Sequence, residues 1–195
     1  MPTTKADATI IAKGTANAAF TQLTGCSVTR TGTTATLTKV THGRSNGDKV
    51  LVQGFSLVEF NGVFTVGGAA ADTFTYTISA DPGANPAGTP GTVDLVTLGA
   101  ALNISTSYAC KIFGGIQNGT TAPTVAPQVW VGEALADVEA DYVWRLLTGG
   151  DSVINSWSPF AYPPQASVQF VNLAVCRNTI QPVDCFALAS HVTAT

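Results

Sequence analysis

The residues best suited to chemistry in this 195-residue chain gather between positions 42 and 66, in the stretch HGRSNGDKVLVQGFSLVEFNGVFTV. The stretch combines His42, Asp48 and Glu59 with four glycines and two short apolar runs. A Ser/His/Asp triad needs a nucleophile on a strained, exposed turn and a histidine held in one orientation. His42 instead stands at the start of a turn, and the other histidine, His191, falls in a terminal strand pattern. We therefore predict no catalytic residue, and we interpret His42 and Asp48 as side chains that cap turns.

A second group of candidate residues is acidic and comprises Glu133, Asp137, Glu139 and Asp141. Glycoside cleavage would require two carboxyl groups set apart across a cleft. Their spacing is also not that of an EF-hand calcium loop. The segment Val131–Asp141 is therefore interpreted as an acidic loop or a single helical turn, with a calcium site kept as the alternative.

The cysteines carry no metal-ligand pattern; they are Cys26, Cys110, Cys176 and Cys185. No CxxC pair occurs and neither histidine stands at zinc-ligand spacing, so neither a metal site nor a cofactor is predicted. Cys176 and Cys185 could face each other across a hairpin centred near Ile180 and Gln181. Buried free thiols are the favoured alternative for a cytoplasmic product.

Aromatic residues gather in the second half of the chain, where Trp157, Phe160 and Tyr162 lie in the Pro-rich stretch WSPFAYPP. This composition is typical of a loop. Exposed rings would suit a protein interface or stacking on a carbohydrate, whereas buried rings would cap the end of a β-sandwich core. All three interpretations stay open, and these residues are the candidate contacts for a partner or a glycan.

The overall composition narrows the class of protein. Hydrophobic residues make up 45% of the chain, which supplies a core, but charged residues make up only 11%, less than half of the usual share. Either hydroxyl-rich threonines cover the surface, or other subunits do. The net charge is −3 and no Lys/Arg cluster occurs, so no nucleic-acid partner is expected. No apolar run is long enough to span a bilayer and no secretory signal is visible, so we expect no membrane partner and synthesis in the cytoplasm.

Most of the chain alternates apolar and polar residues with period two, which predicts strands rather than helices. In the clearest case, Thr73–Ser79 (TFTYTIS), Phe74, Tyr76 and Ile78 would share one face. Turns are expected at Asn46-Gly47-Asp48 and Asn61-Gly62. Further strands are expected at Ala35–Val40, Lys49–Gln53, Val63–Val66, Gln128–Gly132, Tyr142–Leu147, Ser167–Val175 and Asp184–Thr193.

The Pro/Gly-rich segment 81–91, DPGANPAGTPG, interrupts this pattern and is either a long loop or an interdomain connection. The expected fold class is therefore all-β, with two small antiparallel β-barrel or β-sandwich modules. Residues 1–23 form an N-terminal arm or an extra strand, 24–96 a barrel-like module, and 97–195 a sandwich module. Ala8–Ala12 could pair with the second module, which would make the first module an insertion.

Three segments of the first module also carry a resemblance to a known group of proteins. HGRSNGDKV (42–50), EFNGVFTV (59–66) and DTFTYT (72–77) resemble a small β-module that recurs in tailed-bacteriophage virion proteins, including tail, fibre-associated and head-decoration components. The Pro/Ala/Gly-rich segment that follows also resembles the usual end of that module. The resemblance covers roughly residues 27–93 and is specific for the module, but not for the virion part that carries it.

The second module is similar, more loosely, to the β-domains of phage surface and decoration proteins. The resemblance lies in NGTTAP (118–123) and in the terminal pair of segments, 166–177 and 179–193. One departure falls in the first module, where GGAAA (67–71) replaces the Val-rich strand usual in the family. The hairpin there is therefore expected to be looser.

The resemblance implies a non-enzymatic virion structural protein. It points first to a capsid decoration (cement) protein that binds and stabilises the head shell. Its partners would be the major capsid protein or other virion subunits, and further copies of the chain, with a trimer as the expected oligomer. A tail or head–tail accessory protein and a host-glycan-binding surface adhesin are the alternatives. The expected location is the virion, and no catalytic residue is carried over from the family.

Overall fold

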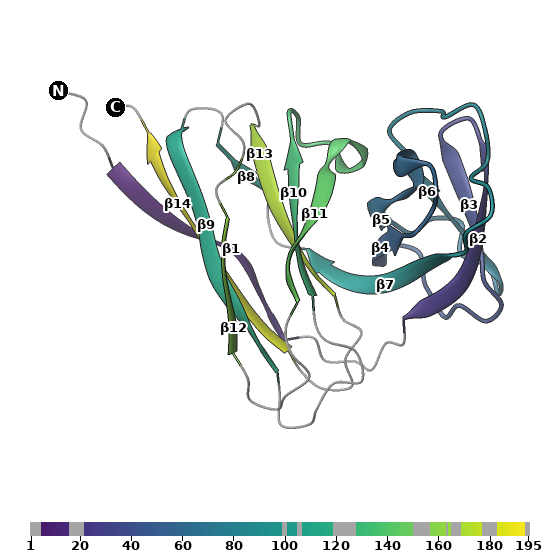
Figure 1. The fold of residues 1–195 in the computed structure, drawn as a ribbon, viewed down its shortest axis with the longest axis horizontal. Coiled ribbons are helices and arrows are strands. Elements are labelled where there is room, and N and C mark those ends of the chain that lie inside the picture. The colour runs from purple at the N-terminus through teal and green to yellow at the C-terminus, as the bar shows by residue number, and fades with distance from the viewer. Residues whose placement is uncertain are drawn as a thin grey trace. The chain divides into compact units, whose positions relative to one another are not determined.

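The computed structural model describes residues 5–15, 22–98, 101–104, 107–118, 128–149, 157–162, 164, 169–176 and 183–193 (Figure 1). Within these residues the chain consists of β-strands and two 3-10 turns, without an α-helix. It divides into two compact units. We call Phe20–Val96 the barrel module, and Met1–Ala19 together with Thr97–Thr195 the sandwich module. The predicted fold class, all-β with two antiparallel modules, is confirmed.

The strands of the barrel module are hydrogen-bonded in the order β5-β4-β7-β2-β3-β6, and every pair is antiparallel. The sheet nearly closes on itself, because Gly67, just after β5, pairs with Thr75 in β6. Each of these two residues donates its N–H to the carbonyl of the other, at 2.8 and 2.7 Å. The elements are β2 (Leu23–Thr31), β3 (Thr34–Thr38), β4 (Lys49–Gln53), η1 (Val58–Phe60), β5 (Gly62–Thr65), β6 (Thr73–Thr77) and β7 (Gly91–Leu98).

Alternation along these strands fills the barrel core. In β6, Phe74 and Tyr76 are buried between less buried threonines, as the period-two pattern predicts. The ring of Phe64 stacks on Tyr76 with centroids 4.5 Å apart, and the Tyr76 hydroxyl donates to the carbonyl oxygen of Phe60 at 3.1 Å. The buried ring of Tyr76 therefore carries a hydroxyl group whose hydrogen bond is satisfied inside the core. Other buried members of this core are Val28, Leu37, Val50, Val52, Val66, Ile78, Val93 and Leu95.

Gly91, the first residue of β7, packs so closely that a side chain does not fit. A Cβ atom there would lie 2.5 Å from Cζ of Phe55 and 2.9 Å from the backbone oxygen of Gln53. We expect Gly91→Ala to destabilise the barrel module by about 2 kcal/mol, because overpacking forces a buried ring or the backbone to move. Hydrogen exchange of the barrel strands measures the loss. Gly67→Ala is the control, because its Cβ would lie 3.4 Å from the hydroxyl oxygen of Thr75, and its effect should be several-fold smaller.

The sandwich module contains two antiparallel sheets. One has the order β1-β14-β9-β12, and in the other β10 lies between β11 and β13, with β8 paired to β13. Val129, Val131, Val171 and Leu173 are fully buried on one face of the second sheet. The elements are β1 (Lys5–Thr15), β8 (Leu102–Asn103), β9 (Ser107–Asn118), β10 (Gln128–Ala134), η2 (Glu139–Asp141), β11 (Val143–Gly149), β12 (Trp157–Tyr162), β13 (Phe170–Cys176) and β14 (Val183–Thr193).

The N-terminal segment belongs to the sandwich module. Figure 1 shows β1 (purple) beside the last strand, β14 (yellow), with Ala8 opposite Ser190 and Ala12 opposite Ala187. The chain thus first forms β1 of the sandwich module and then the whole barrel module. It returns to the sandwich module along β7. This is the arrangement in which the first module is an insertion into the second.

Two sequence interpretations need correction, and the structure decides between the two alternatives for a third segment. Trp157–Tyr162 is strand β12, paired with β9, and not a loop. For the segment 81–91 the loop alternative is confirmed, because residues 81–90 connect β6 to β7 inside the barrel module and Gly91 already belongs to β7. The hairpin proposed to join Cys176 and Cys185 does not form, because β13 and β14 belong to different sheets with their own neighbours. The side chains of these two cysteines lie outside the described residues.

Candidate functional site

The imidazole of His42 is built into the barrel module. The side chain is 2% exposed and meets the ring of Phe74 edge-on at 5.2 Å. Its Nδ1 accepts the backbone N–H of Arg44 at 2.9 Å, and its Nε2 lies 3.0 Å from the carbonyl oxygen of Thr73. Because Nδ1 accepts, the neutral ring carries its proton on Nε2 and donates it to Thr73. Both ring nitrogens are thus used to hold the 42–44 turn against β6.

The side chains of Asp48 and Asn46 accept backbone hydrogen bonds that hold the next turn in place. Asp48 Oδ2 accepts the N–H of Ser45 at 2.9 Å, and Asn46 Oδ1 accepts the N–H of Ala69 at 2.8 Å. Gly47 sits between them with a φ of 89°, which residues with a side chain rarely adopt. The prediction that His42 and Asp48 cap turns is confirmed.

Asn61 plays a larger part than its predicted place in an Asn-Gly turn. Its backbone is extended, with φ −103° and ψ 132°, and Gly62 already belongs to β5, so the turn lies at η1, just before the predicted Asn61-Gly62. The side chain accepts the N–H of Phe55 at 2.9 Å and donates to the carbonyl oxygens of Phe55 at 2.8 Å and Leu57 at 3.1 Å. One amide thereby fixes the whole segment between β4 and β5.

Residues 43–47, GRSNG, match the GxSxG spacing of a hydrolase nucleophile elbow, a match that the sequence reasoning missed. In a nucleophile elbow the serine lies on a sharp turn between a strand and a helix. Here Ser45 lies in the 42–48 segment between β3 and β4, with its N–H bound to Asp48. Since each ring nitrogen of His42 already contacts the backbone, neither is in position to take a proton from Ser45.

Polar groups are also buried inside the barrel module. Asp94 is 1% exposed and accepts from Nε2 of Gln22 at 2.8 Å. Burial lowers the pKa of Arg44, against the opposing charges of Asp48 and Asp94. Burial likewise raises the pKa of Cys26, which keeps its thiol protonated and poorly reactive. These groups lie within the core of the barrel module.

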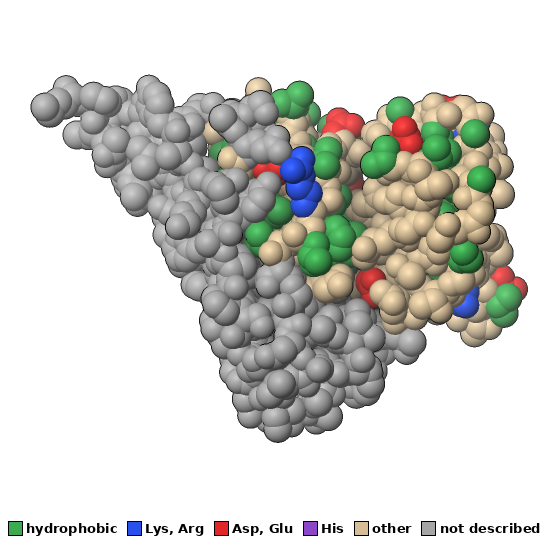
Figure 2. Space-filling model, in the orientation of Figure 1, with side chains coloured by type: hydrophobic (Ala, Val, Ile, Leu, Met, Phe, Trp, Pro, Cys, Tyr) green, Lys and Arg blue, Asp and Glu red, His purple; other side chains and the backbone are tan. Residues whose placement is uncertain are grey.

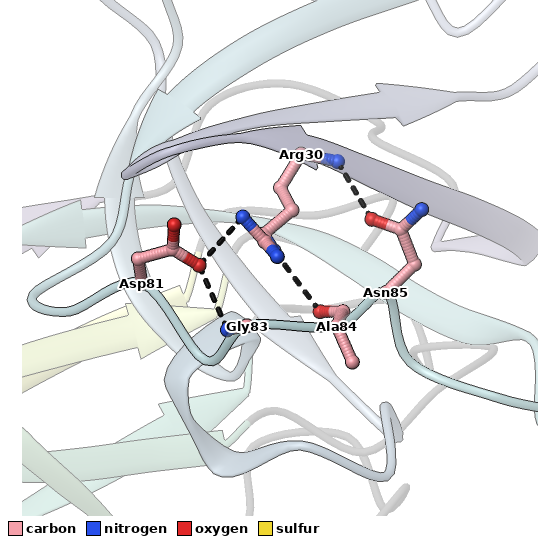
Figure 3. A network of polar contacts seen from close by, with 5 residues as sticks. All are labelled: Arg30, Asp81, Gly83, Ala84 and Asn85. Carbon is pink, nitrogen blue, oxygen red and sulfur yellow. Dashed lines mark hydrogen bonds and ion pairs between the residues drawn. The ribbon is translucent and has the colours of Figure 1, made fainter.

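The loop between β6 and β7 is tied to β2 by Arg30 (Figure 3). Figure 3 shows the guanidinium directed at Asp81, with Nη1 2.6 Å from Oδ1. The same side chain donates from Nε to the carbonyl oxygen of Ala84 at 3.2 Å, and the backbone N–H of Arg30 donates to Oδ1 of Asn85 at 3.0 Å. Asp81 also accepts the N–H of Gly83 at 2.8 Å. Four contacts thus order a segment whose composition alone predicts no structure.

Removal of the Arg30 side chain should loosen the 81–90 loop without unfolding the barrel module. We expect Arg30→Ala to cost only about 0.5 kcal/mol, because the Arg30–Asp81 pair is partly exposed. Cleavage within 81–90 by a protease of broad specificity should nevertheless become several-fold faster. Arg145→Ala, on the sandwich module, is the matched control. Equal cleavage rates in the Arg30 variant and the unsubstituted chain would show that the contacts do not order the loop.

The acidic residues of the sandwich module lie in different structural settings and do not form one cluster. Glu133 is buried on β10, Asp137 accepts the hydroxyl of Tyr142 at 2.8 Å, and Glu139–Asp141 forms η2, so the expected single helical turn is a 3-10 turn. Burial and the bond to Asp137 raise the pKa of Tyr142. Across the described residues, no three His, Cys, Asp or Glu side chains come together as a metal-ion site would require.

The predicted contact residues Trp157, Phe160 and Tyr162 all lie on β12, an edge strand of its sheet. Their backbone is described, whereas their side chains lie outside the described residues. Whether these rings cap the core, meet a protein or stack on a glycan therefore stays a prediction. None of the described residues forms a helix long and apolar enough to span a membrane.

The sequence reasoning missed a group of exposed apolar side chains on β11 and on the segment that joins β10 to η2. Leu135 is 66% exposed, Val138 50%, Val143 57% and Leu146 50%. Figure 2 shows green hydrophobic side chains beside blue and red ones over this part of the sandwich module. The period-two pattern of Tyr142–Leu147 had suggested one buried face, but a strand at the edge of a sheet exposes more of both faces.

Three comparisons with known proteins found no match to this chain. No family model matches the sequence, and neither the curated proteins nor the solved structures contain a significant match.

Proposed function

We propose that the chain is a non-enzymatic structural subunit of a tailed-phage virion, and specifically a capsid decoration protein that binds the head shell. One observation carries the proposal: the polar residues of the resembling segments are bonded to the backbone of the barrel module itself. His42 joins Arg44 to Thr73, and Asn61 joins both ends of the 55–61 segment. The residues shared with the virion modules therefore build the fold, which is where a likeness between structural subunits should lie.

Surface chemistry supports the same proposal. Charged residues make up 11% of the chain, and apolar side chains are exposed on both modules, including Val40 at 71% and Val58 at 75%. Such a surface suits a subunit that neighbours cover in an assembly. One module would dock on the major capsid protein or another virion subunit, while the other contacts a neighbouring copy. Stability would come from many repeated contacts, and the chain would be found in the virion.

The proposal is tested by adding the purified chain to phage particles that lack it. The unsubstituted chain should bind in a saturable manner and raise the temperature at which the particles release DNA. Arg30→Ala should bind equally well if docking does not use the 81–90 loop. Absence of binding to heads, with binding to tails, would replace decoration by the tail or head–tail accessory role. Binding to neither, with binding to host glycans that Trp157→Ala abolishes, would support the adhesin alternative.

A further inference from the structure

The sheet edges of this chain differ in how they are protected against pairing with another strand. In the barrel module, Gly67 and Thr75 join the two edges of the sheet. In the sandwich module, β8 has only two residues, and β12 carries Pro159 in its middle, opposite Gly115. β1 contains two lysines and a register irregularity between Ile10 and Ala12. Short strands, proline, lysine and bulges are the devices that keep edges from associating.

β11 has less protection than these edges. It has seven residues, Val143–Gly149, without proline or lysine. One edge pairs with β10, and within the described residues no strand is hydrogen-bonded to the other edge. β12 comes close to β11 without pairing with it. The only irregularity falls near the end of the strand, where Val129 pairs with Thr148 and Trp130 with Leu146.

Three exposed residues at and just before the start of β11 can pair with the same residues of a second copy. Asp141, Val143 and Arg145 alternate with the more buried Tyr142 and Trp144, and all three are exposed; we call them the β11 stripe. Tyr142 is already extended, with φ −70° and ψ 123°, and Asp141, the last residue of η2, directly precedes it. In an antiparallel pair of two such strands centred on Val143, each Asp141 lies just before its strand, near Arg145 of the second copy. Opposite charges and apolar pairs are the favourable cross-strand combinations.

We propose that β11 is a two-fold interface, at which the strand pairs antiparallel with β11 of a second copy, Val143 against Val143 and Asp141 against Arg145. The two-fold arrangement satisfies both charge pairs at once, because the same patch is used by both copies. A single pair of short strands covers much less than the ~800 Å² per partner of a standard interface. The dimer is therefore weak in dilute solution and forms readily where an assembly holds copies close together. The pairing does not depend on which particle the chain belongs to.

Disulfide trapping tests the register directly. Cβ atoms of directly opposed residues lie about 5 Å apart in an antiparallel pair, so Val143→Cys should give a covalent dimer under mild oxidation. Val58→Cys is the matched control, because Val58 is even more exposed but lies on the barrel module. The unsubstituted chain measures dimers formed through the native cysteines. Val143→Cys should exceed both several-fold, and a yield equal to that of Val58→Cys overturns the proposal.

A charge exchange tests the contact without a covalent bond. In sedimentation velocity, the unsubstituted chain should form more dimer as its concentration rises, and less at high salt. Arg145→Asp and Asp141→Arg each place like charges opposite one another and should abolish the dimer. The double exchange, Asp141→Arg with Arg145→Asp, restores opposite pairs and should recover it. Circular dichroism confirms that each variant is folded. If a charge variant is unfolded, disulfide trapping with Val143→Cys tests the pairing instead. The pairing is contradicted if the unsubstituted chain stays monomeric at every concentration or first associates as a trimer. It is also contradicted if the double exchange does not recover the dimer.

Discussion

Substitution of His42 by alanine should destabilise the barrel module by about 3 kcal/mol, since it removes two hydrogen bonds and the packing of a buried ring. The N–H of Arg44 and the carbonyl of Thr73 would lose their partner, and a cavity would open beside Phe74. Amide exchange of the barrel strands is the suitable measurement, because the tryptophans of the chain all lie in the sandwich module. Exchange limited by global opening of the module should become about 100-fold faster, at tenfold per 1.4 kcal/mol.

His42→Asn provides an internal control. The asparagine Oδ1 can take the place of Nδ1 and accept the N–H of Arg44, but the amide does not reach Thr73. We expect a loss between those of the unsubstituted chain and the alanine variant. A loss in His42→Ala of under about 0.5 kcal/mol, as at an ordinary surface position, would mean that His42 is not part of the fold and that its role must be sought elsewhere.

Asn61→Ala should destabilise the barrel module by about 2 kcal/mol, because it deletes three hydrogen bonds and leaves the N–H of Phe55 without an acceptor. Phe55 and Phe60, at the two ends of this segment, meet edge-on at 6.4 Å and are both buried. Loosening the segment should therefore also speed amide exchange in β4 and β5. Amide exchange by mass spectrometry resolves these strands from the rest of the barrel.

Asn46→Ala is the matched control for Asn61. Asn46 is exposed and makes one hydrogen bond, to the N–H of Ala69. Its loss should cost about 0.5–1 kcal/mol, as is usual for a single bond near water. If the two asparagine variants proved equally stable, the three bonds of Asn61 would carry no more weight than one surface contact.

Strand positions were the most predictable part of the fold. Lys49–Gln53 is β4 with the expected bounds, and Phe74, Tyr76 and Ile78 are buried as their spacing indicates. Alternation is a local signal, so one sequence suffices to read it. The roles of His42 and Asp48 were predictable for the same reason, because a turn brings its own capping residues together.

Contacts between distant positions were not predictable. Arg30 and Asp81 come from different parts of the barrel module, and no short-range pattern links them. Composition also misled at Trp157–Tyr162, where a proline suggested a loop, although an edge strand tolerates proline where no ladder bond is needed. The GRSNG match illustrates the opposite limit, because spacing alone does not reveal that both nitrogens of His42 contact the backbone.

The copy number of this chain in intact phage particles tests the proposed function most directly. Quantitative mass spectrometry of purified virions, with the major capsid protein as internal reference, gives the number of chains per particle. A decoration protein that covers the head shell should be present in hundreds of copies. A handful of copies would place the chain in the tail or neck, and its absence from particles that contain all other structural proteins would contradict a virion role.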